Sequence, residues 1–372
     1  MKKYLLPSLL LCAASAFAQT TTYTLNVHLK NGDNVQYKVA DIERITFDGE
    51  QETPEPTEVF AVQIPADFST GWVQKVMNGD KQVAEVAKEY INSIKKQVVV
   101  VYPMNADGRA DLTKGLTSTG ASVVWDMDAN TATVGQEGEA LTTVYVAGDK
   151  ILPAYSGETV ASTLSPYVIS DRRGLFERNT YKIVKIGTQY WMAENLRTTY
   201  FRDGTSIASI SSGEDAVWKA NTTGAYLAST DSDWLKVAGH LYNGYCVTSE
   251  KGIAPEGWEV PSTEQWKKLR IAGGGDNAAN FKAADFGMWG EGMTGNNITG
   301  FDAVATGTYL NGDITAIYSD TYFWGSTVST SWLKVEGLCT FRLNGTSTKV
   351  VVSGPDDCHK YTYGHPIRCV RK

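Results

Sequence analysis

The sequence predicts a multi-domain α+β protein: a β-ribbon, a small α+β domain, and a carboxyl-terminal domain of short strands and loops. Three observations predict it. Apolar residues alternate over residues 22–47, recur at helical spacing over residues 83–94, and give way from residue 170 to glycine and aromatic residues with few long periodic segments. The chain has 372 residues, 42% of them hydrophobic, which is enough for two or three globular domains.

Residues 1–18 have the pattern of a secretory signal peptide. Lys2 and Lys3 precede an apolar segment over residues 5–14, and Ala16-Phe17-Ala18 has the small residues of a cleavage site. The mature chain is therefore expected to begin at Gln19.

Cys12 lies where a lipid-modified cysteine could stand, but Leu11 before it is larger than the residue a lipoprotein peptidase requires. Soluble export is therefore favoured over lipidation. No later segment has the ~18 consecutive apolar residues of a membrane-spanning helix. We expect an exported protein, in the extracellular space, on the outer-membrane surface or in the periplasm.

Residues 19–48 are expected to form the β-ribbon. Asn31-Gly32 is a strong hairpin turn between two alternating runs, which contain Tyr23, Leu25, Val27 and Leu29 on one side and Val35, Tyr37 and Val39 on the other. Ile45 and Phe47 indicate a third strand. The proline-rich acidic stretch at residues 49–58 is expected to be a linker.

Residues 59–168 are expected to form the small α+β domain. Helical spacing over residues 83–94 involves Val83, Val86, Ala87, Tyr90, Ile91 and Ile94. A buried strand is predicted at residues 97–102, and further antiparallel strands at residues 122–125, 131–134 and 141–146.

One segment of this domain has part of a calcium-loop pattern. Its acidic and amide residues stand at the first, third, fifth and twelfth loop positions: Asp126, Asp128, Asn130 and Glu137. Thr131, however, occupies the sixth position, where the loop needs glycine, and no helices flank it. The pattern instead favours a β-hairpin turn.

Residues 170–372 are expected to form the carboxyl-terminal domain. Residues 180–196 predict two strands joined at Gly187-Thr188. Ser262 and Gln265 have the spacing of a capping box at the start of a helix, on which Trp266 and Leu269 share one face. A capped helix with its apolar face packed in the core has a structural role, and we expect no binding site on it. Without Cys12 the chain has four cysteines, with no C-x-x-C spacing, and an oxidising compartment predicts two disulfides with three connectivities left open.

Five ordered motifs resemble the Fibrobacter succinogenes major paralogous domain, a family found on exported bacterial proteins, especially of Bacteroidetes. The resemblance covers residues 170–372. It rests on GTQYWMAENLRTTYFRDGTSI (residues 187–207), GHLYNGY (239–245), APEGWEVPSTEQWKKL (254–269), YFWGST (322–327) and PIRCVRK (366–372).

That family is similar in turn to the C-type lectin and formylglycine-generating-enzyme fold. The resemblance implies a capped helix and a terminal R-C-V-R strand that brace a loop-rich body, with any ligand on the loops. It also implies disulfides Cys246–Cys369 and Cys339–Cys358. Ala254 stands where the family usually has the cysteine that pairs with the terminal strand, so Cys246 is expected to replace it.

Several function classes find little support. The net charge of −7 and the lack of clustered basic residues argue against nucleic acid. No hydrolase elbow, zinc-protease helix or phosphate loop occurs, and the four histidines are scattered, although His359 and His365 could flank a site. The resemblance offers an oxygen-dependent oxidase as a remote alternative, but Cys339 and Cys358 lack the spacing of its reactive pair. GPDDC (residues 354–358) is close to one lectin calcium motif, yet its E-P-N or Q-P-D partner is missing.

We therefore expect a non-enzymatic binding protein without a cofactor, which recognises a glycan or a surface protein in the manner of an adhesin. The alternative is a structural or fimbria-associated surface component without a glycan ligand. Candidate contact residues combine aromatic rings, which suit sugar faces, with amide and carboxylate groups, which suit hydroxyls. They are Trp289, Asn296, Asn297, Tyr309, Tyr318, Trp332, Asp356 and Asp357.

Overall fold

The structure is a computed structural model that describes residues 24–28, 33–41, 58–66, 68, 72–227, 237–285, 287–293, 295–331 and 333–372. It is mostly β, with a few short helices and several sheets, two of which curl into half-barrels. The chain divides into a unit of residues 1–56 and a unit of residues 57–372. The predicted signal peptide, the Asn31-Gly32 turn, Ile45, Phe47 and the linker up to Thr57 lie outside the described residues.

The first unit contains the predicted ribbon. Strand β1 (Thr24–His28) pairs antiparallel with β2 (Asn34–Lys38), and Leu25 lies opposite Tyr37. A short 3-10 helix, η1 (Val39–Asp41), follows. The alternation of apolar residues therefore predicted these two strands correctly.

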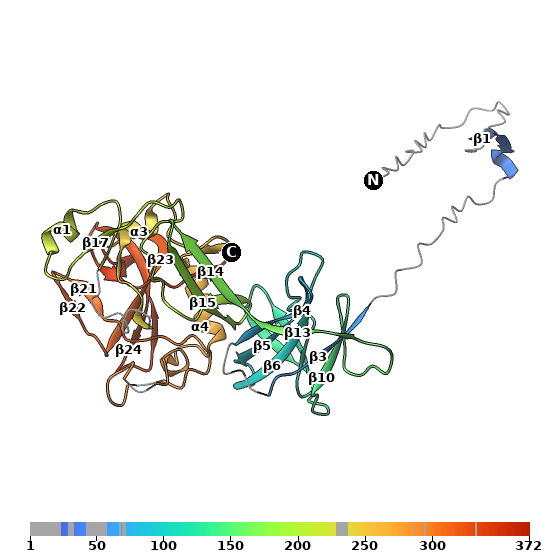
Figure 1. The fold of residues 1–372 in the computed structure, drawn as a ribbon, viewed down its shortest axis with the longest axis horizontal. Coiled ribbons are helices and arrows are strands. Elements are labelled where there is room, and N and C mark those ends of the chain that lie inside the picture. Colours follow the sequence, from blue (N-terminus) through green and yellow to red (C-terminus); the bar gives the residue numbers. More distant parts are fainter. Residues whose placement is uncertain are drawn as a thin grey trace. The chain divides into compact units, whose positions relative to one another are not determined.

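The second unit contains a seven-stranded antiparallel sheet, part of which is labelled in Figure 1. Its strands, in spatial order, are β13 (Thr163–Pro166), β4 (Val73–Asn78), β5 (Lys81–Ile91), β6 (Lys96–Pro103), β7 (Gly115–Thr117), β8 (Ser122–Asp126) and β9 (Thr131–Val134). The predicted strands of residues 97–102, 122–125 and 131–134 are confirmed.

The helix predicted at residues 83–94 is wrong, because this segment is strand β5. It pairs with β4 on one side and with β6 on the other. Residues on both of its faces are buried, so the apolar positions do not alternate as they do in a half-exposed strand. Their spacing then fits a helix by coincidence.

A four-stranded sheet completes this lobe. Its spatial order is β11 (Lys150–Leu152), β10 (Thr143–Ala147), β3 (Val59–Gln63) and β12 (Val160–Ala161), with β12 parallel to β3. Side chains from both sheets, such as Val62, Val86 and Val144, share one hydrophobic core. The described part of residues 59–166, here called the amino-terminal lobe, therefore contains only strands, and the predicted α+β class for it is corrected to all-β.

The carboxyl-terminal lobe, residues 168–372, contains three sheets. A five-stranded sheet has the order β14 (Val168–Arg173), β15 (Glu177–Ile186), β16 (Gln189–Met192), β27 (Val370–Arg371) and β20 (Trp258–Glu259). A six-stranded sheet has the order β17 (Ala208–Ile210), β18 (Ala225–Leu227), β19 (Tyr242–Asn243), β26 (Gly364–His365), β21 (Thr308–Leu310) and β22 (Asp313–Thr315). The third sheet consists of β23 (Asp320–Thr330), β24 (Glu336–Asn344) and β25 (Val350–Val352).

The helices whose bounds lie within the described part of this lobe are short: α1 (Asp215–Ala220), α3 (Gly244–Thr248) and α4 (Thr263–Ala272), with 3-10 turns η2 (Ala278–Asn280) and η3 (Pro355–Asp357). The predicted capping box of α4 is confirmed, since Ser262 Oγ accepts from Gln265 N and Gln265 Oε1 accepts from Ser262 N. Trp266 and Leu269 are buried. The helix is thus a brace of the fold, as its sequence indicates.

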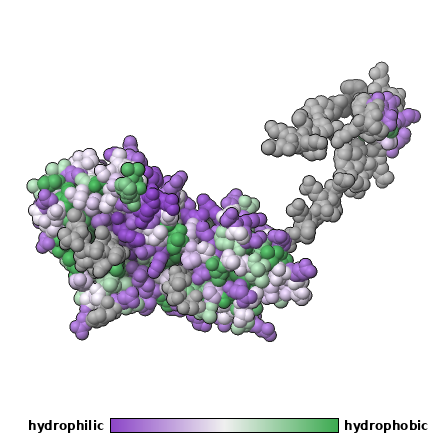
Figure 2. Space-filling view, viewed as in Figure 1, coloured by the Kyte–Doolittle hydropathy of each residue, from purple (hydrophilic) through white to green (hydrophobic). Residues whose placement is uncertain are grey.

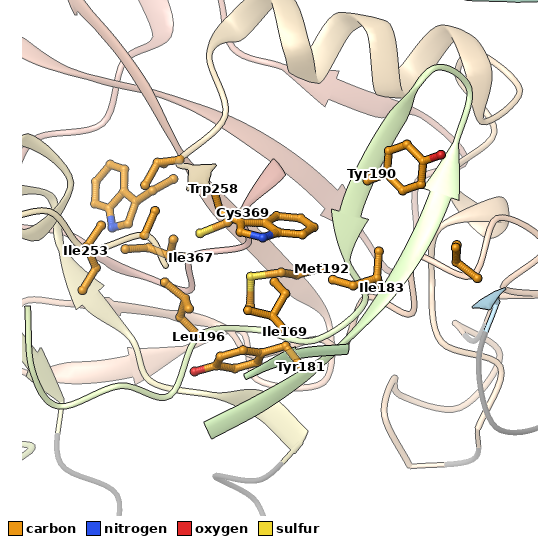
Figure 3. Close-up of a cluster of buried hydrophobic side chains, with 14 of the residues drawn as sticks. Ile169, Tyr181, Ile183, Tyr190, Met192, Leu196, Ile253, Trp258, Ile367 and Cys369 are labelled. Atoms are coloured by element: carbon orange, nitrogen blue, oxygen red, sulfur yellow. The ribbon is translucent and has the colours of Figure 1, made fainter. Parts of the chain in front are cut away.

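The two lobes share a hydrophobic core. Val73 and Val100 of the amino-terminal lobe belong to the same buried cluster as Ile183, Met192 and Trp258 of the carboxyl-terminal lobe. Figure 3 shows the carboxyl-terminal part of this cluster, with Tyr190 near the turn end of the β15–β16 hairpin. This hairpin is one of the elements through which the lobes meet, since β15 packs on β4 and β5.

Candidate functional site

The turn of the β15–β16 hairpin is fixed to the amino-terminal lobe by one buried amide. Asn130, in the β8–β9 turn, accepts hydrogen bonds through Oδ1 from Thr188 N (2.6 Å) and Thr188 Oγ1 (2.8 Å). Its Nδ2 donates to Lys268 O at 2.7 Å, in helix α4. Gly187 has a positive φ of 63°, and a Cβ atom at this position would lie 2.4 Å from Asn130 Oδ1, which is too close for a side chain. Three elements distant in sequence are therefore held together at one point.

Beside this point lies a cavity of about 500 Å³ between the β6–β7 loop and the β15–β16 hairpin. A second cavity of about 460 Å³ shares several lining residues with it: Met127, Thr188, Gln189 and Arg371. We call the two together the junction groove. Its first cavity is lined by Asn105, Asp107, Arg109, Ala110, Asp111, Leu112, Thr113, Met127, Thr188, Gln189, Tyr190, Arg371 and Lys372.

Most of the residues that line the groove are polar. One of its groups has no partner in the described structure: Gln189 Oε1 is buried and accepts no hydrogen bond. A buried acceptor without a donor costs about 1–3 kcal/mol, so this oxygen is suited to a donor from a ligand or from water. Met127 adds an apolar surface and is 50% exposed.

The basic side chains Arg109 and Arg371 of the groove form no ion pairs with described residues, whereas the acidic side chain Asp111 does. Arg371 lies over the rings of Tyr167 (5.8 Å) and Tyr190 (5.5 Å), and neither it nor Arg109 forms an ion pair among the described residues. Asp111, by contrast, accepts from Thr113 Oγ1 at 2.6 Å and pairs with Lys114 at 3.3 Å. Hydrogen bonds from these two residues hold the pKa of Asp111 below its usual value, against the opposing effect of burial.

The floor of the groove covers a buried carboxyl group. Tyr190 Oη donates to Glu85 Oε1 at 2.5 Å, and Glu85 is only 2% exposed. Burial raises the pKa of Glu85 to about 7, against the opposing effects of Tyr190, Lys185 and Arg371. A side chain of the groove, Arg371, is thus electrostatically linked to a group beneath it.

A fully buried ion pair lies next to Glu85. Lys185 of β15 contacts Glu89 of β5, and neither side chain is exposed to solvent. Lys185 also donates to Gly187 O at 2.7 Å and lies 4.4 Å from the ring centre of Trp125, while Tyr102 Oη donates to Glu89. Burial raises the pKa of Glu89 and lowers that of Lys185, and each partner offsets part of the effect on the other. This pair joins the lobes and does not face the groove.

The contact residues predicted from the sequence lie elsewhere, and they do not form one cluster. Trp289 and Tyr309 are buried in two separate hydrophobic cores. Asn296 and Tyr318 are exposed, Asn297 is half-buried and bonds to Asp302 at 3.0 Å, and Trp332 lies outside the described residues. Asp356 and Asp357 are exposed in η3.

His359 and His365 are brought into direct contact. His359 Nδ1 lies 2.7 Å from His365 Nε2, and the Tyr322 ring lies 4.9 and 5.2 Å from the two imidazoles. Burial lowers the pKa of His359 to about 4 and also lowers that of His365. Within the described residues, no group of three or more His, Cys, Asp or Glu side chains could hold a metal ion. The pair is thus a neutral, packed element.

The four cysteines among the described residues are thiols in this structure. Cys246, Cys339 and Cys369 are buried and Cys358 is half-buried. Burial raises the pKa of both Cys246 and Cys369. Neither of the implied disulfides is formed here, and buried thiols of raised pKa are poor nucleophiles.

The comparison with protein families gives one match. The model of the Fibrobacter succinogenes major domain matches residues 184–371, which is about half of the chain. The chain belongs to this family. No curated protein and no solved structure matches the chain.

The Fibrobacter succinogenes major domain begins within β15 and ends within β27. It therefore supplies Lys185, Tyr190 and Arg371, whereas Glu85 and Arg109 come from the preceding lobe. The junction groove is shared between this domain and that lobe. No helix in the described part of the chain is long and apolar enough to cross a membrane.

Sequence reasoning missed the groove, although one signal for it was present. Glu85 and Glu89 stand at a spacing of four in a segment that is apolar apart from them and Lys88, and this spacing places both glutamates on one face of a strand. Buried acids of this kind need partners. Their partners, Tyr190 and Lys185, stand about 100 residues later, and no local pattern connects them.

Proposed function

We propose that this protein is an exported, non-catalytic binding protein that recognises a glycan in the junction groove. The observation that carries the proposal is a groove whose first cavity has a volume of about 500 Å³ and is lined mostly by polar residues, among them Gln189, whose Oε1 accepts no hydrogen bond from a described residue. Sugar hydroxyls donate hydrogen bonds to such acceptors, and a cavity of this volume holds one or two sugar units.

The position of the groove supports recognition. It lies at the meeting of two lobes, where ligand sites are frequent, and its walls are fixed by the Asn130 hydrogen bonds. Walls that are already in place reduce the ordering cost of binding. Figure 2 shows hydrophilic residues mixed with hydrophobic ones on the face in view.

The state of the acids supports binding without catalysis. Hydrolysis of a glycosidic bond needs a carboxylic acid with a raised pKa that faces the sugar. In the groove, Asp111 has a lowered pKa and is held by Thr113 and Lys114. Glu85 has a raised pKa but is covered by Tyr190.

We also propose that the carboxyl-terminal lobe has a C-type-lectin-like fold and that the protein is exported. The carboxyl-terminal lobe resembles the C-type lectin fold through its sequence motifs, and the capped helix α4, which packs on β23, β24 and β25, supports that resemblance. Export rests on the signal-peptide pattern of residues 1–18.

A glycan array probed with the mature chain tests the proposal. We expect selective binding that is lost in Gln189→Ala, whose truncated side chain cannot accept the bond. The matched control is Asn296→Ala, an exposed amide outside the groove. Binding that survives Gln189→Ala but is lost in Asn296→Ala would move the site to the loops, and a blank array from folded protein would refute glycan recognition.

A further inference from the structure

We propose that the glycan held in the junction groove carries an anionic group, a carboxylate or a sulfate, which is bound between Arg109 and Arg371. This inference rests on the proposed function and adds the chemical class of the ligand. Arginine suits such groups because its planar fork donates two parallel hydrogen bonds to them.

Arg371 is a fixed cation whose guanidinium is not neutralised by an ion pair with any described residue. Its strand is held on both sides, because Trp258 lies opposite Arg371 and Trp191 opposite Val370. The guanidinium lies over the Tyr167 and Tyr190 rings, and it makes no ion pair with a described residue. The aromatic rings position the guanidinium group but do not neutralise its charge. Its N–H groups, which point outward in the guanidinium plane, are not used as donors by the rings.

Arg109 reaches the same groove from the other lobe. Its backbone is fixed by Asn105, whose Oδ1 accepts from Arg109 N at 2.9 Å and whose N donates to Arg109 O at 2.7 Å. Its side chain is exposed and has no ion-pair partner in the described structure. Arg109 and Arg371 both act to lower the pKa of Tyr167, so both charges lie near one hydroxyl.

The charge balance of the first cavity favours an anion. Its basic side chains are Arg109, Arg371 and Lys372, and its acidic ones are Asp107 and Asp111. Asp111 is already engaged by Lys114, which leaves Asp107 against the three cationic side chains of this cavity. The second cavity adds Lys268, Glu259 and Glu264, but Glu264 pairs with Lys267, and Glu259 accepts a hydrogen bond from Gln265 Nε2 at 2.6 Å. The first cavity, in which basic side chains outnumber acidic ones, therefore concentrates anions locally on a chain of net charge −7.

Arg371 also links the ligand to Glu85 beneath the floor. The groups that face Glu85 are Tyr190, which donates to it, and the charges of Lys185, Arg371 and Glu89. An anion bound to Arg371 offsets the positive charge that favours ionised Glu85. Binding should therefore be accompanied by proton uptake, and the affinity should rise as the pH falls from 8 to 6.

The test is isothermal titration calorimetry on the mature chain with three sets of probes: a uronic-acid oligosaccharide, a sulfated oligosaccharide and a neutral oligosaccharide of equal length. We expect binding of at least one acidic probe and a loss of roughly 10- to 100-fold in its affinity in Arg371→Gln and in Arg109→Gln. Arg109 is an exposed loop residue, so Arg109→Gln should fold normally. It therefore tests the inference even if Arg371→Gln, which changes a residue of strand β27, fails to fold. The matched control, Arg172→Gln, removes an exposed charge on β14 and should leave the affinity unchanged.

The outcomes are distinct. The carboxylate and sulfate probes identify which acidic group is bound. Equal affinity for neutral and acidic probes, with no effect of Arg371→Gln and Arg109→Gln, overturns the inference and leaves glycan recognition standing. No heat with any probe, together with a blank array, overturns both.

Discussion

Glu89 of β5 and Lys185 of β15 form an ion pair between the two lobes in which neither side chain reaches solvent. Desolvation of two charges costs several kcal/mol, and the attraction repays it only when further hydrogen bonds are present. Here Tyr102 donates to Glu89, and Lys185 donates to Gly187 O. The lobes are thus joined by a polar network in which each charge depends on its partner.

Removal of one charge should destabilise the chain more than removal of both. Lys185→Met leaves Glu89 buried without its cation, and we expect a loss of about 3–5 kcal/mol in the free energy of unfolding. The double variant Glu89→Gln with Lys185→Met should lose less than Lys185→Met alone. Urea denaturation followed by tryptophan fluorescence measures both. A double variant as unstable as the sum of its single variants would show that the two residues act independently.

Glu85 should make the protein less stable as the pH rises. Its pKa is raised from 4.5 to about 7 in the folded state, so the folded state binds more protons than the unfolded state between these values. Stability due to this group is therefore lost as the pH rises through that window, by up to about 3 kcal/mol. The unfolding free energies of the native protein and of Glu85→Gln should be measured at pH 4.5 and at pH 8. Relative to the variant, the native protein should be less stable at pH 8 than at pH 4.5, by up to about 3 kcal/mol. A difference that is the same at both values contradicts the account.

The His359–His365 pair should have the opposite pH dependence. The pKa of His359 falls from 6.5 to about 4, so the unfolded state binds more protons in that window and stability is lost on acidification. The native protein should lose more stability than His359→Gln between pH 7 and pH 4, by up to about 3 kcal/mol. Thermal unfolding at both pH values tests this, and an equal loss in both proteins would exclude the histidine as the cause. Between pH 4.5 and 6.5 the effects of Glu85 and His359 oppose each other.

Gly187 should tolerate alanine less well than another glycine of similar backbone conformation. A Cβ at Gly187 would stand 2.4 Å from Asn130 Oδ1 and 2.6 Å from Ala272 Cβ, whereas Gly204, with a φ of 86°, has no atom within 4 Å of that position. Both substitutions carry the cost of a positive φ, of the order of 1 kcal/mol. Gly187→Ala should cost a further 1–3 kcal/mol, roughly as overpacking does, because the Asn130 bonds must break. Equal unfolding free energies for the two variants would show that Asn130 does not fix the turn.

The sequence predicted those features that depend on neighbours along the chain. The ribbon strands, the β8–β9 hairpin, the β15–β16 hairpin and the capping box of α4 all follow from alternation, turn residues or a spacing of three. Strand β5 was predicted as a helix because burial on both faces removes the alternation that identifies a strand.

The candidate site could not be predicted in the same way. Arg109 and Arg371 are far apart in the sequence, and they line one cavity because β27 pairs with β16 and the β15–β16 hairpin packs on the amino-terminal lobe. Aromatic residues in loop-rich sequence suggested the loops instead. The structure buries Trp289 and Tyr309 in the core, where the hydrophobic area of their rings is removed from water.

The most direct test of the central claim is a crystal structure of the mature chain soaked with the strongest oligosaccharide from the array. We predict density for the sugar in the junction groove, with a hydroxyl within hydrogen-bond distance of Gln189 Oε1 and an acidic group at Arg371. Density on the loops around Tyr318 or Asp357, with an empty groove, would contradict the account.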